Sequence, residues 1–180
     1  MKCFLFFGGV FTVFALIYCD VNKEESIPVV DKKTVAHSIL GNVDETLSKR
    51  YRFHSCGVGE ATHKDDNLYK EMGLLFKVQG PISKEEGRRI LVDSVQEFLR
   101  QVNTHPDFRQ FMHVYPFTPE NIDITFFVSD KDRRGVFYPD IRVFAARRGK
   151  VTYQTKSSEQ EYGYYTDEEE TWDEALQEVK

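Results

Sequence analysis

Side chains able to do chemistry gather between positions 54 and 66 of this 180-residue chain. They are two imidazoles, one thiol and three carboxylates, from His54, Cys56, His63, Glu60, Asp65 and Asp66. Two kinds of site use such groups: a metal centre held by imidazole and thiolate, or a cysteine nucleophile activated by a nearby histidine. Each kind requires a spacing that can be checked in the sequence.

The spacing disfavours both kinds of site. The pattern His-x-Cys-x6-His lacks the closely paired ligands of structural zinc motifs, and no known cysteine-hydrolase signature surrounds Cys56. The glycines and charges of this stretch predict an exposed loop. We therefore expect no catalytic residue, no metal ligand and no cofactor. Cys56 acting with His54 or His63 is kept as the alternative of a secreted enzyme.

Other catalytic motifs are absent from the chain. Gly57-Val58-Gly59 has neither the third glycine nor the following Lys-Ser/Thr of a phosphate-binding loop. No HExxH, GxSxG, CxxC or EF-hand pattern occurs. The formal net charge of −5 argues against a nucleic-acid partner, because nucleic-acid binders usually carry a strongly basic face.

The first residues have the pattern of a secretory signal peptide. Lys2 precedes a charge-free stretch over 3–19, within which Phe4–Tyr18 is apolar. A membrane-spanning helix needs about 20 apolar residues, so this run is short for a permanent anchor and fits a signal peptide over 1–18. The polar residues up to position 33 predict a tether between membrane and domain.

The stretch Leu16-Ile17-Tyr18-Cys19 resembles the lipobox of bacterial lipoproteins. The resemblance covers residues 16–19 only. It implies that the Cys19 thiol carries a diacylglycerol and that the chain is cut just before Cys19. It also implies a lipid anchor in the membrane of a bacterial cell envelope. Tyr18 departs from the family, which prefers Ala, Gly or Ser there. Asp20 marks inner-membrane retention in enteric lipoproteins, but the choice between inner and outer membrane stays open.

Other outcomes for this segment remain open. Cleavage after Ala15 or after Cys19 would give a secreted or periplasmic soluble protein, and the segment could also stay as an uncleaved anchor or a buried helix. An acylated Cys19 would leave Cys56 as an unpaired thiol. Cleavage after Ala15 would allow the two cysteines to form a disulfide.

The rest of the chain predicts an α+β domain over 34–156. Asp31 can cap a helix over 32–51, and Ser83 with Glu86 forms a capping box before a helix over 84–103. Alternating apolar residues predict strands over 72–78 and 122–129, and two further strands are expected over 141–147 and 151–156. We expect an antiparallel sheet of about four strands packed against two main helices.

The acidic tail over 157–180 holds nine acids and one lysine. Thr166 and Glu169 match a capping box and predict a short amphipathic helix with Trp172, Leu176 and Val179 on one face. This helix could dock on its own domain or on another protein. The acidic segment 167–174 could also meet one of the basic clusters of the body, Arg133/Arg134 or Arg147/Arg148/Lys150.

The function expected from these features is that of a lipid-anchored envelope protein. Its α+β domain would be a non-enzymatic binding or interaction module, and the expected partner is another envelope protein. The alternatives are the secreted Cys56 enzyme and a structural subunit that assembles through the Trp172 helix.

Overall fold

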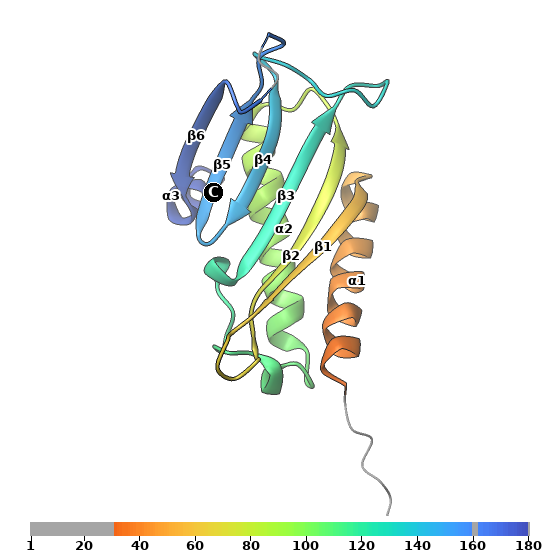
Figure 1. Ribbon diagram of the computed structural model, residues 1–180, viewed down its shortest axis with the longest axis vertical. Helices are drawn as coiled ribbons and strands as arrows, with labels where there is room; N and C mark the ends of the chain where they lie inside the picture. Colours follow the sequence, from red (N-terminus) through yellow and green to blue (C-terminus); the bar gives the residue numbers. More distant parts are fainter. Residues whose placement is uncertain (1–30, 160–161, 180) are drawn as a thin grey trace, which may run out of the picture.

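The computed structural model describes residues 31–159 and 162–179, so the signal segment, Cys19 and most of the tether lie outside the described residues. The described chain forms one sheet with helices against it (Figure 1). In chain order the elements are α1 (Lys32–Tyr51), β1 (His54–Thr62), β2 (Tyr69–Gln79), α2 (Lys84–Thr104), η1 (Arg109–Phe111), η2 (Pro119–Asn121), β3 (Ile122–Ser129), β4 (Ile141–Arg147), β5 (Lys150–Thr155), β6 (Thr166–Thr171) and α3 (Trp172–Glu178).

The six strands lie in the sheet in sequence order, from β1 at one edge to β6 at the other. All neighbours are antiparallel except β2 and β3, which are parallel. Helix α2 connects these two strands, because a parallel pair needs a crossover that returns the chain to the same end of the sheet. The α+β class is confirmed, whereas a purely antiparallel sheet of about four strands is corrected to a mixed sheet of six.

Strand β1 occupies the stretch that the sequence predicts as a loop. Its residues HSCGVGEAT contain two glycines and lack the alternation of a half-buried strand. The strand forms because it pairs along most of its length with β2, with an irregularity between Ser55 and Gly57. Pairing with a buried neighbour here outweighs low intrinsic strand propensity.

Strand β6 corrects the prediction of a helix beginning near Thr166. Residues TDEEET pair with β5 as an edge strand, and the helix begins later, at Trp172. The capping box is the one between Thr171 and Glu174, in which each side chain accepts from the other's backbone N–H. The acidic segment is therefore part of the sheet.

The two main helices begin where the sequence predicts. Asp31 accepts a hydrogen bond from the Thr34 N–H at the start of α1, and Ser83 accepts from the Glu86 N–H at the start of α2. Both helices cover the same face of the sheet (Figure 1). Under them Phe76, Phe126 and Phe144 stack across three neighbouring strands and are fully buried. This ladder forms the centre of the core.

The molecule has two different ends (Figure 1). The first turn of α1, the β1–β2 hairpin loop and the segment 105–121 lie at one end. The loops that follow β3 and β5 lie at the opposite end. Among the described helices, none is both long and apolar enough to cross a membrane.

Candidate functional site

Strand β1 separates the residues that the sequence places close together. Cys56 falls at the irregularity of β1 and is exposed. His63 follows the far end of the strand. Since a strand rises about 3.3 Å per residue, seven residues put Cys56 and His63 roughly 20 Å apart. His54 lies two residues from Cys56 and is also exposed, so neither imidazole is buried against the thiol.

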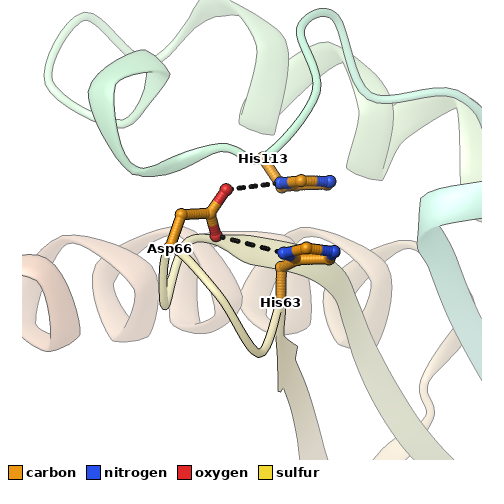
Figure 2. A group of neighbouring side chains, drawn as sticks. All are labelled: His63, Asp66 and His113. Atoms are coloured by element: carbon orange, nitrogen blue, oxygen red, sulfur yellow. Dashed lines mark hydrogen bonds and ion pairs between the residues drawn. The ribbon is translucent and has the colours of Figure 1, made fainter.

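His63 instead lies beside two residues from other positions, Asp66 and His113 (Figure 2). Asp66 belongs to the same hairpin loop, but His113 comes from the segment between α2 and β3. The sequence shows His63 and Asp66 in one loop but does not show their contact with His113. Asp66 and His113 are 47 residues apart, and no local pattern marks the contact.

The residues predicted for an interaction helix pack against the protein's own core. Trp172, Leu176 and Val179 are partly buried there, and Ala175 on the same helix is fully buried. The apolar face of this helix is therefore covered by the protein's own core.

The acidic strand β6 is held by basic side chains of the sheet and of α2. Lys84 pairs with Glu168 at 2.7 Å, and Lys150 pairs with Glu169 at 2.6 Å. Of the predicted basic clusters, only Lys150 takes part in these contacts. The other partners lie on α2, whose position against β6 the sequence does not show.

Glu170 forms the most enclosed of these contacts. Arg88 donates two hydrogen bonds of 2.8 Å to its carboxylate, and the Tyr153 hydroxyl donates a third at 2.6 Å. Burial opposes the charge on Glu170, but these hydrogen bonds outweigh it and keep the pKa of Glu170 below its ordinary value. Burial and the neighbouring carboxylate raise the pKa of Tyr153. The network fastens β6 to α2.

Exposed aromatic side chains gather at the end of the sheet opposite to the start of α1. The loops after β3 and β5 adjoin there, since the Tyr138 N–H donates to the Lys156 carbonyl and the Tyr138 and Tyr165 rings meet edge to face at 5.0 Å. We name this surface the aromatic end; its members, each at least 47% exposed, are Phe137, Tyr138, Tyr162, Tyr164 and Tyr165.

A cleft of about 670 Å³ opens beside the aromatic end. Ile82 and Lys84, before and at the start of α2, line part of it, and the exposed Tyr138 lines another part. The buried ring of Tyr153 lines the cleft as well. Its volume lies in the range of ligand-binding clefts, and its lining is about equally polar and apolar, with the charged side chains of Lys84, Glu86 and Glu168 beside Ile82.

The sequence carries a signal for the aromatic end that spacing rules do not detect. Tyr162, Tyr164 and Tyr165 stand in a stretch without helical or strand periodicity, where bulky aromatic residues have no expected core to enter. Comparisons of the chain with protein-family models, with curated proteins and with solved structures find no match.

Proposed function

We propose that this protein is a lipid-anchored, non-enzymatic binding module of the bacterial cell envelope, and that it binds a protein partner through the aromatic end. The single observation that carries the proposal is the group of five exposed aromatic side chains on the adjoining loops after β3 and β5, one of which, Tyr138, lines a cleft. An exposed apolar patch of this kind commonly marks a binding surface.

The composition of the aromatic end favours a protein as the partner. Four of its five members are tyrosines, and tyrosine is enriched at protein interfaces because it offers a large apolar ring with a polar hydroxyl and few torsions to fix. Tyr162 is 84% exposed. Burial of such an exposed ring against another molecule would remove a large apolar surface from water and so favour binding.

The predicted anchor is consistent with this use of the surface. The resemblance of residues 16–19 to a lipobox would attach the chain to a membrane through Cys19, and the tether would lead into α1. Helix α1 begins at the end of the molecule opposite to the aromatic end (Figure 1). The aromatic end is therefore the part of the domain most able to face away from the tether.

The two alternatives receive less support. An enzyme using Cys56 requires a histidine within hydrogen-bond reach. The length of β1 separates Cys56 from His63, and His54 and Cys56 are both exposed on an edge strand, outside any enclosed site. Assembly through the α3 helix requires a free apolar face, whereas Trp172 and Leu176 pack against the core of their own chain.

Site-specific photo-crosslinking in living cells tests the binding surface. A photoreactive phenylalanine analogue at position 162 should give a discrete protein adduct. The matched control is the same analogue at Lys49 of α1, whose side chain is 74% exposed but lies outside the aromatic end; it should give none. Truncation of an interfacial aromatic costs about 2 kcal/mol at a hot spot, so Tyr138→Ala should weaken the adduct from position 162. No adduct at 162, or equal adducts at both positions, would contradict the proposal.

A further inference from the structure

The end of the molecule opposite to the aromatic end holds a cluster of two histidines and one aspartate. The His63 and His113 rings are stacked, with centroids 3.8 Å apart and planes 9° from parallel. Figure 2 shows the Asp66 carboxylate beside the Nδ1 edge of both rings. One Asp66 oxygen lies 2.6 Å from His113 Nδ1, and the other lies 3.6 Å from His63 Nδ1.

Backbone hydrogen bonds fix the position of each of these residues. The hairpin loop is closed by the His63 N–H, which donates to the Leu68 carbonyl at 2.7 Å. The Leu68 N–H donates to Asp66 Oδ1 at 2.9 Å and so orients the carboxylate. The His113 N–H donates to the carbonyl of buried Tyr69 at 2.8 Å. The three side chains are therefore held together by the fold.

One atom of the cluster lacks a satisfactory partner in the described structure. His63 Nδ1 is shielded from solvent and makes no hydrogen bond there, because 3.6 Å to Asp66 is too long for one. A buried nitrogen without a partner costs free energy and calls for an explanation, such as an ion. Both Nδ1 atoms face the one carboxylate, so the three possible ligand atoms lie together on one side of the cluster.

We infer that His63, Asp66 and His113 bind a divalent transition-metal ion, with Zn²⁺ as the probe. Their ligand atoms lie within 4.8 Å of one another. Zinc accepts imidazole nitrogen and carboxylate oxygen at about 2.0–2.2 Å, which places tetrahedral ligand atoms about 3.3 Å apart. The distances of 2.6 Å and 3.6 Å lie on either side of that value. Binding therefore requires the two rings to turn out of their parallel stack and the His113–Asp66 hydrogen bond to open.

The choice of metal follows from the donor set and the exposure. Two imidazoles favour zinc, copper or nickel over calcium and magnesium, which prefer oxygen ligands. The three side chains are each about one-third exposed, at 36%, 38% and 32% for His63, Asp66 and His113. An ion can reach them from solvent, and water can fill the remaining coordination position.

Binding would join two parts of the chain that are distant in sequence. The hairpin loop supplies two ligands, and the segment between α2 and β3 supplies the third. Asp66 already accepts from Leu68, which is the kind of outer hydrogen bond that orients a ligating carboxylate. This inference does not depend on the proposed function of the aromatic end.

Titration of the full-length protein in detergent, without a polyhistidine tag, tests the site. Calorimetry with Zn²⁺ should show one ion per chain for the wild type. Asp66→Asn, which keeps an acceptor for the Leu68 N–H, and His113→Ala should each weaken binding at least about tenfold. The matched control, His54→Ala, removes an exposed histidine outside the cluster and should bind as the wild type does.

A second readout on the wild type is independent of whether a variant folds. In ¹⁵N spectra of the imidazoles, one equivalent of Zn²⁺ should shift the ring nitrogens of His63 and His113 and leave those of His37, His54 and His105 unchanged. The inference is overturned if the wild type binds no zinc, if the shifts fall on the other histidines, or if folded Asp66→Asn binds zinc as tightly as the wild type.

Discussion

At the scale of single residues, the pair between Arg88 and Glu170 is the most enclosed ion pair among the described residues. The side chains of Arg88 and Glu170 are only 12% and 13% exposed, and the buried Tyr153 donates to the same carboxylate. Removal of one partner from such a pair leaves the other charge without compensation. Exposed pairs contribute much less, because solvent screens them.

We expect Arg88→Ala to lower the free energy of unfolding by about 3 kcal/mol at neutral pH. Lys84→Ala is the matched control, since its pair with Glu168 is more exposed, and it should cost less than about 1 kcal/mol. Urea unfolding with both variants measures the difference. Equal small effects would show that the pair is not enclosed in solution.

The pH dependence of this effect has a definite sign. The pKa of Glu170 lies below its ordinary value of 4.5 in the folded protein, so the stabilisation by its charge is present above 4.5 and is lost as the pH falls through the folded pKa. The cost of Arg88→Ala should therefore shrink in the acidic range below 4.5. A cost that stays constant there would assign the effect to packing instead of charge.

Single residues also show where prediction from sequence stops. His63 and Asp66 stand in one loop and are visible as a pair. His113 joins them only because the segment after α2 returns to the hairpin loop, where its backbone bonds to Tyr69. Cys56 and His63 show the reverse, since residues close in sequence are carried apart by an extended strand.

At the scale of elements, the two main helices were predictable, whereas the edge strands and the start of α3 were not. Asp31 and Ser83 cap α1 and α2 because capping depends on neighbouring residues alone. Strands β1 and β6 depend on partners elsewhere in the chain: β1 on the edge of β2, and β6 on β5 and the basic side chains of α2. The acids of β6 have no strand propensity of their own.

The parallel contact between β2 and β3 makes a prediction about packing. A Cβ atom added at Gly73 would lie 2.5 Å from the Asp123 carbonyl oxygen on the neighbouring strand. Because this oxygen belongs to the backbone, the clash can be relieved only by moving one of the two strands. We expect Gly73→Ala to lower the free energy of unfolding by about 2 kcal/mol. Gly59→Ala on β1 is the matched control, because no atom lies within 4 Å of its added Cβ.

Denaturant unfolding of the two alanine variants tests the contact. The control should change stability by less than about 1 kcal/mol. If Gly73→Ala is as stable as Gly59→Ala, the close approach of β2 and β3 does not exist in solution.

At the scale of the whole molecule, the sheet separates two ends with different chemistry. The imidazole–carboxylate cluster lies with the start of α1, and the aromatic end lies opposite (Figure 1). The sequence predicts the α+β class because periodic segments mark the helices and central strands. It does not predict which loops share an end, since that follows from strand direction and from the crossover through α2.

The separation of the two ends explains why the lipid anchor matters to the proposed function. With a lipid on Cys19, the chain would enter the domain beside the metal-binding cluster and leave the aromatic end to face a partner. A soluble secreted form would impose no such orientation. The proposed orientation of the aromatic end therefore depends on one claim, that Cys19 carries a lipid.

The intact mass of the protein purified from membranes tests that claim most directly. We predict a polypeptide that begins at Cys19 and carries the added mass of a diacylglycerol. A polypeptide that begins at Leu16, Asp20 or Val21 without lipid would contradict the claim and replace the anchored module with a secreted protein.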